Sequence, residues 1–157
     1  ALMEMDFFTI LLLASLFVVI AGIQEAGVID AIAALFVKMG GNSVFIMYSL
    51  LLWASVLFSA FIDNIPYVAT MLPVVTGIAA AMNVDPTVLY FGLLSGATLG
   101  GNLTPIGASA NIMGIGILRR QGYEVKNSEF MRISIPYTVA AITTAYLVLW
   151  LIWGIRA

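Results

Sequence analysis

Apolar residues occur along this chain in long runs, which predict the membrane-spanning elements. The first run, 7–23, is about as long as a minimal spanning helix, so we expect a transmembrane helix there. The last run, 131–155, predicts another, and Pro136 is better tolerated near its start than in its interior. The stretch 28–39 carries two charges and is too short to span, so we expect an interfacial or connecting helix.

The two central apolar runs are each interrupted by an asparagine that is followed within three residues by a proline. In the run 43–82 the interruption lies at 61–66, which predicts a helical hairpin with its tip there. In the run 87–118 it lies at 100–105, which predicts one transmembrane helix broken in two. We therefore expect an all-α membrane protein with a single transmembrane domain over residues 1–157.

Composition supports a bilayer as the solvent of these helices. Apolar residues make up 62% of the chain and charged residues 9%, against about 45–50% and about 25% in soluble domains. Cysteine and histidine are both absent, which removes disulfides, the usual transition-metal ligands and the commonest general base. We expect membrane lipid as a partner, no nucleic acid, no cofactor and no enzymatic activity.

The positive charges predict an orientation. Arg119, Arg120, Lys126 and Arg132 cluster around one polar loop. Because cytoplasmic loops carry an excess of Lys and Arg, we expect the loop 119–132 on the cytoplasmic side of the cell (inner) membrane.

The two interruptions are the candidate site. Backbone groups freed inside hydrocarbon cost several kcal/mol each, so broken helices persist where protein or a wet cavity satisfies them. The end of one half-helix offers carbonyls that favour a cation, and the start of the next offers amides that favour an anion or a neutral oxygen. The residues expected to shape the breaks are Pro66, Gly100, Gly101, Pro105 and Gly107.

Asp63 is the one acidic residue that we expect deep within the apolar framework. A carboxylate there needs an ion, a proton or a strong donor, so we predict that Asp63 and Asn64 bind Na⁺, or that Asp63 carries H⁺. The alternative is that 62–65 is an ordinary loop between two full crossings, with Asp63 solvated. The candidate ion- or solute-binding residues are Ser59, Asp63, Asn64, Thr70, Asn102, Thr104, Ser109 and Asn111.

Three glycines spaced by four residues, Gly92, Gly96 and Gly100, share one helical face. Small residues at this spacing let two helices approach closely. We expect this face to be a packing seam.

The sequences around the interruptions resemble a known family. They read SAFIDNIPYVATMLP from Ser59 to Pro73 and GATLGGNLTPIGASAN from Gly96 to Asn111. Together they resemble the ion-transporter superfamily, in the branch that holds arsenical-pump permeases, sodium/proton antiporters and the melanosomal P protein. Citrate-type and divalent-anion/sodium symporters are more distant relatives, and the resemblance covers most of the chain.

This resemblance implies the second inverted repeat of an elevator-type secondary transporter, commonly a homodimer, with a re-entrant hairpin and a broken helix. A first-half repeat of the same protein would complete the site, and the start at Ala1 instead of Met agrees with a longer protein. Where the symporter branch has a Ser-Asn-Thr type tip, this chain has Asp63 ahead of Asn64. A fixed negative charge there disfavours a dianion.

Three functions compete at this point. The first is secondary active transport coupled to Na⁺ or H⁺, as cation/proton antiport or arsenite-type efflux of a small solute. The second is Na⁺-coupled transport of an organic anion such as citrate on the same fold, with Asp63 protonated or structural. The third is a non-transporting membrane scaffold whose breaks are packing kinks.

Overall fold

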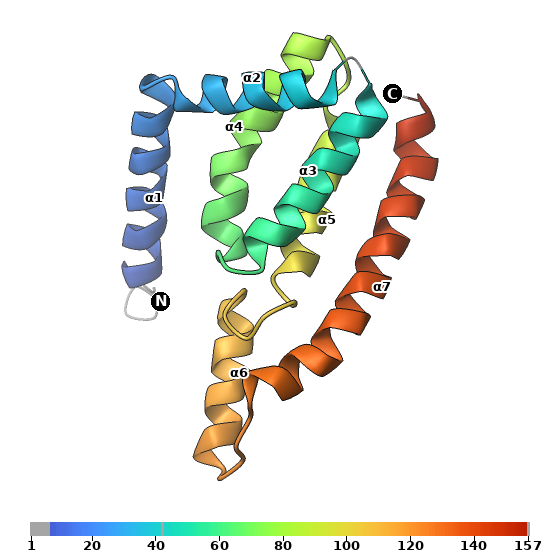
Figure 1. Ribbon diagram of the computed structural model, residues 1–157. Helices are drawn as coiled ribbons and strands as arrows, with labels where there is room; N and C mark the ends of the chain where they lie inside the picture. Colours follow the sequence, from blue (N-terminus) through green and yellow to red (C-terminus); the bar gives the residue numbers. More distant parts are fainter. Residues whose placement is uncertain (1–6, 42, 157) are drawn as a thin grey trace, which may run out of the picture.

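The computed structural model describes residues 7–41 and 43–156. Within these ranges the chain forms seven α-helices and one 3₁₀ turn, and no strand (Figure 1). The predicted all-α class is therefore confirmed. In chain order the elements are α1 (Phe7–Glu25), α2 (Val28–Gly40), α3 (Val44–Ser59), α4 (Asn64–Met82), α5 (Thr87–Gly100), α6 (Ser109–Arg120), α7 (Asn127–Trp153) and η2 (Gly154–Arg156).

Two helices, α4 and α7, are long and apolar enough to cross a membrane. The pair α1 and α2 is bent by 67° and would make a third span if it crosses as one unit. Gly27 lies between them with φ of +71°, a left-handed conformation that glycine adopts without steric cost. After this bend α2 runs across one end of α4 and α3 (Figure 1).

The most extensive helix contact is that of α3 with α5, and glycines allow it. A Cβ atom on Gly96 would lie 2.8 Å from Cβ of Ser55, and one on Gly100 would lie 2.6 Å from the backbone of Val56. Gly92 faces α3 in the same way. The predicted packing seam is confirmed, because any side chain at these positions would force the two helices apart.

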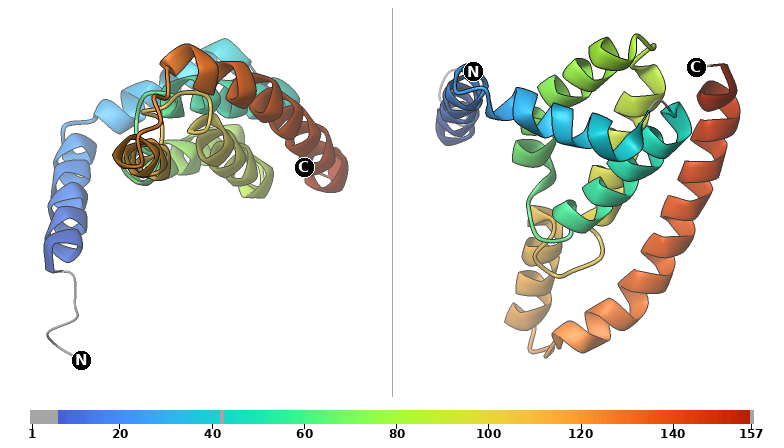
Figure 2. Two further views of the ribbon diagram at one scale, coloured as in Figure 1. Left: turned by 90° about the horizontal axis from the view of Figure 1, so that it is seen from below. Right: turned by 45° about the horizontal axis from the view of Figure 1, so that its top comes forward.

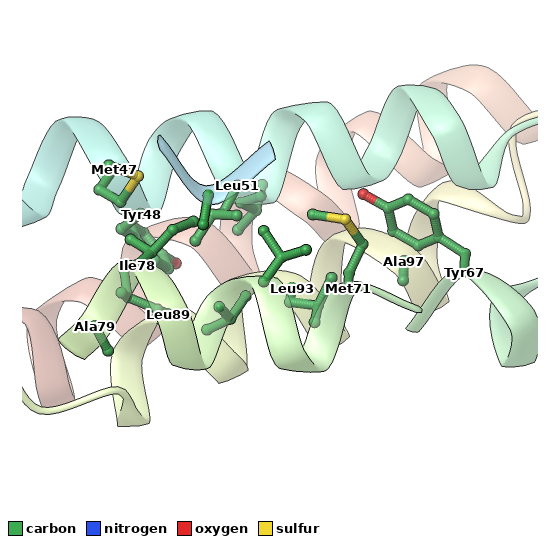
Figure 3. Packing of buried hydrophobic residues seen from close by; sticks show 14 of the residues in the cluster. Met47, Tyr48, Leu51, Tyr67, Met71, Ile78, Ala79, Leu89, Leu93 and Ala97 are labelled. Carbon is green, nitrogen blue, oxygen red and sulfur yellow. The ribbon is translucent and has the colours of Figure 1, made fainter. Parts of the chain in front are cut away.

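The core lies where α3, α4 and α5 face one another, and Figure 3 shows their apolar side chains interleaved. Residues of all three helices are fully buried there, among them Met47, Leu51, Ile78, Leu89 and Leu93. A polar contact crosses this core, because the Tyr67 hydroxyl donates to Ser55 Oγ at 3.0 Å. The hairpin α3–α4 and the helix α5 therefore form one packed unit.

The long helix α7 covers this unit on one side (Figure 1). The Tyr48 hydroxyl of α3 donates to the carbonyl of Tyr146 at 3.0 Å, and the two rings stack with centroids 5.3 Å apart. The predicted start of this helix, 131, lies within α7, which begins at Asn127. The difference has a local cause, since the Glu129 carboxylate accepts the backbone N–H of Lys126 and caps an earlier first turn.

Two helices lie at the periphery. α1 stands apart from the α3–α5 core and contacts mainly α2 and α4 (Figure 2). α6 extends beyond the hairpin and has no buried residue in the described structure (Figure 1). The site described next lies between the packed unit and the start of α6.

Candidate functional site

The two predicted interruptions meet in space (Figure 1). We call residues 60–63, between α3 and α4, the tip, and residues 101–108, between α5 and α6, the break. The hydroxyl of Thr104 in the break is buried and donates to the carbonyl of Ala60 in the tip. A Cβ atom on Gly107 would lie 2.8 Å from that same carbonyl oxygen, so only glycine lets the two backbones approach this closely.

Asp63 connects the starts of two helices. Its Oδ1 accepts the backbone N–H of Ile65, in the first turn of α4, at 3.5 Å. Its Oδ2 accepts the hydroxyl of Ser109, the first residue of α6. Ala108, which precedes α6, provides no side-chain cap. One half-buried carboxylate therefore contacts both half-helix starts.

Ser59 and Asn64 form a second contact beside the tip. The buried Ser59 Oγ lies 2.6 Å from Asn64 Oδ1 and 2.5 Å from the carbonyl oxygen of Ala97 on α5. A hydroxyl has one proton and can donate to only one of these two acceptors. A Cβ atom on Gly101 would lie 2.8 Å from the same Asn64 oxygen, so the backbone of the break at Gly101 packs closely against the Asn64 side chain. The result is a cluster of three oxygen atoms, in which the Ala97 carbonyl also accepts the backbone N–H of Gly101 at 3.3 Å.

Asn111 holds the break in shape. Its Nδ2 donates to the carbonyls of Gly101 and Thr104, both at 3.0 Å. Asn102 and Pro105 lie within the break and are half-buried. The break runs from 101 to 108 and is longer than the predicted 100–105, and Gly100 is still the last residue of α5.

Two predicted residues lie on α4 beyond the tip. Pro66 is in the first turn of the helix, where its missing N–H costs no hydrogen bond. The hydroxyl of Thr70 donates to the Pro66 carbonyl at 2.8 Å. Both line an apolar groove of about 590 Å³ between α2, α3 and α4. The structure therefore places Thr70 in this groove and not against the break.

Sequence reasoning missed one supporting residue. Ser134 of α7 donates its hydroxyl to the carbonyl of Leu103 at 3.0 Å, which satisfies a backbone oxygen of the break from the outside. No signal in the sequence singles out this serine, because it is one of several small polar residues in a long apolar helix. Only the packing of α7 brings it to the break.

Comparison with known proteins identifies the family of this chain. A family model described as citrate transporter matches residues 1–156 of this chain. The chain belongs to the citrate transporter family. The predicted kinship with the ion-transporter superfamily is thereby confirmed. Membership in this family, together with the apolar helices, makes the chain part of an integral membrane protein.

Individual relatives agree with the family. An uncharacterized transporter of Mycobacterium tuberculosis is 38% identical over 152 residues, which are 96% of this chain and 35% of the relative. The 46 kDa membrane protein of Mycobacterium leprae is 37% identical over 145 residues, 91% of this chain and 34% of the relative. The human P protein is 36% identical over 151 residues, 89% of this chain and 18% of the relative.

The chain thus spans about a third of the length of the mycobacterial relatives. No solved structure matches it.

Proposed function

We propose that this chain is the second half of a secondary active transporter, with its ion and solute site where the tip meets the break. The observation that carries the proposal is the contact of Asp63 with Ser109, 46 residues further along the chain. Transporters place their sites where half-helices end inside the membrane, since irregular backbone is tolerated there only in contact with protein or a wet cavity.

The oxygen cluster beside the tip supports a cation as the coupling ion. Ser59 Oγ, Asn64 Oδ1 and the Ala97 carbonyl oxygen lie together beside the tip. A small hard cation takes neutral oxygens of this kind as ligands. Asp63 is the next residue to Asn64 and supplies negative charge. We propose that Ser59 and Asn64 bind Na⁺ with Asp63 nearby, or that Asp63 carries H⁺ in its place.

The level at which the hairpin turns supports a re-entrant hairpin. α7 has 27 residues and is about 40 Å long, enough to cross a bilayer. The hairpin turns at the level of the break, and α6 continues beyond that level (Figure 1). A first-half repeat, encoded in the remainder of a longer protein, would complete the site. We propose that the full protein is a homodimer with the loop 119–132 in the cytoplasm, and that it works by an elevator motion.

Two solute classes follow from different observations. The fixed charge of Asp63 favours cation/proton antiport or arsenite-type efflux of a neutral solute, because a second negative charge at the tip would be repelled. The family description favours an organic anion such as citrate as the alternative. The two motifs by themselves resemble the antiporter branch more closely than the citrate-type carriers.

Ion flux tests the proposal. The full-length protein is reconstituted in liposomes, and Na⁺ and H⁺ fluxes are compared for wild type, Asp63→Asn and a control, Asp85→Asn. Asp85 is exposed in the turn between α4 and α5, and hydrogen bonds from Thr87 lower the pKa of its carboxyl, so the control removes the same negative charge.

We expect Asp63→Asn to reduce coupled flux at least about tenfold and Asp85→Asn to leave it unchanged. Coupled flux that survives Asp63→Asn would contradict a coupling role for this carboxylate. Na⁺-coupled uptake of labelled citrate that Asp63→Asn leaves unchanged would favour the alternative. A wild-type protein that moves no ion and no solute would support the third function, a non-transporting membrane scaffold.

A further inference from the structure

The position of Asp63 carries an inference about which solutes the site accepts, and it rests on the function proposed above. We propose that Asp63 is the specificity-determining residue and acts as the site's own anion. Its carboxylate occupies the place between the starts of α4 and α6 that the carboxylate of a solute would otherwise occupy. The site therefore takes cations and neutral solutes and rejects free carboxylates.

The first step is the geometry of the two helix starts. The first N–H groups of a helix lack intrahelical acceptors and favour negative charge. Asp63 Oδ1 accepts from Ile65 in the first turn of α4, and Oδ2 accepts from Ser109 at the start of α6. The carboxylate thus meets both starts at once, although they belong to segments separated by the whole of α5.

The second step is the inventory of donors around that place. Nδ2 of Asn111 already donates to the carbonyls of Gly101 and Thr104. The Thr104 hydroxyl already donates to the carbonyl of Ala60. The tip and the break contain no Lys or Arg. A solute carboxylate would find these donors engaged, no basic partner on either segment, and a fixed negative charge beside it.

The third step is electrostatic. Two like charges placed side by side at an interface disfavour binding strongly, and more so away from bulk water. Removal of the charge from Asp63 leaves the Ile65 amide of α4 and the Ser109 hydroxyl at the start of α6 without their anion. An external carboxylate can then take that position, because helix N-termini bind anions readily.

Succinate, a dianion at neutral pH, is the probe. Its equilibrium binding is measured at pH 7 on the purified full-length protein as wild type, Asp63→Asn, Asp63→Ser and Asp63→Glu, with Asp85→Asn as the control. We expect Asp63→Asn and Asp63→Ser to bind succinate at least about tenfold more tightly than wild type. Asp63→Glu, which keeps the charge, and Asp85→Asn should bind as weakly as wild type.

Wild type that binds succinate as tightly as Asp63→Asn would overturn the inference, as would an equal gain in Asp85→Asn. A second measurement does not depend on any solute. In a Ser109→Cys protein, a cationic thiol reagent should react faster than an anionic one of the same size, and Asp63→Asn should abolish that preference. Equal rates with Asp63 present would also overturn the inference.

These experiments separate the inference from the proposed function. Both read binding or local charge and not flux, so the selectivity can fail while ion-coupled transport stands. Conversely, a wild type without any flux would remove the transport proposal, and the charge of Asp63 at Ser109 would still be measured.

Discussion

The buried hydroxyl of Ser59 lies 2.6 Å from the side-chain oxygen of Asn64, across the tip that joins α3 to α4. The same hydroxyl lies 2.5 Å from the carbonyl oxygen of Ala97, so three oxygens from three helices converge beside Asp63. This small cluster is the most specific feature that the fold builds from the two interruptions.

Ser59→Ala should weaken Na⁺ binding at least about tenfold, because it removes one of the three clustered oxygens. The measurement is the Na⁺ concentration that half-maximally raises the melting temperature of the full-length protein. Ser128→Ala, at an exposed position of α7, is the control and should leave this concentration unchanged. An unaltered Na⁺ response in folded Ser59→Ala would exclude Ser59 as a ligand.

Gly101→Ala should separate the tip from the break. The added Cβ atom would lie 2.8 Å from Asn64 Oδ1 and 3.0 Å from the carbonyl oxygen of Gly107, so the Asn64 side chain must move and the Gly107 carbonyl must give way. Overpacking of this kind costs about 1–3 kcal/mol of stability. Thermal unfolding of the full-length protein measures the loss. Gly22→Ala on α1, where a Cβ atom meets nothing within 4 Å, should cost much less; an equal loss for both would speak against the tight contact.

Thr138→Val should stabilise the protein. Thr138 is 1% exposed, and its hydroxyl has no hydrogen-bond partner in the described part of the chain. An unsatisfied buried polar group costs about 1–3 kcal/mol, and valine has the same shape without that group. Thr143→Val is the matched control, since its exposed hydroxyl bonds the carbonyl of Val139. A lower melting temperature for Thr138→Val would show that the hydroxyl has a partner in the full protein.

Tyr146→Phe should loosen α7 from the hairpin. The Tyr146 hydroxyl and Ser49 Oγ share a hydrogen bond of 2.7 Å, whereas the stack on Tyr48 survives the substitution. The expected loss is about 0.5–1.5 kcal/mol. A double-mutant cycle with Ser49→Ala isolates the pair, and additive losses in the double variant would argue against their coupling.

The sequence predicted the helical class because long apolar runs leave little alternative in a bilayer. It also singled out the residues that the fold brings together, since an asparagine and a proline in an apolar run are local signals. These residues lie at the tip, in the break or in the first turn of α4 or α6: Asp63, Asn64, Thr104, Ser109 and Asn111. Their role in transport stays a prediction.

Other features depend on packing and could not be foreseen. The Ser134 hydroxyl reaches the Leu103 carbonyl only because α7 lies against that side of the break. Thr70 is a predicted site residue within the motif Ser59–Pro73, but helical rotation turns it into the apolar groove with Pro66. The break extends to 108 because the Asn111 amide satisfies its carbonyls, a contact that spacing alone does not reveal.

The central claim is that tip and break form a site reached by water, and not a dry packing kink. Thiol modification in native membranes tests it most directly, with Ser109→Cys in the full-length protein freed of other cysteines; this chain contributes none. A polar, membrane-impermeant reagent should modify Ser109→Cys and leave Thr138→Cys, at a buried position of α7, unmodified. If the reagent, applied from either side of the membrane, modifies Ser109→Cys no faster than Thr138→Cys, the result would contradict the account.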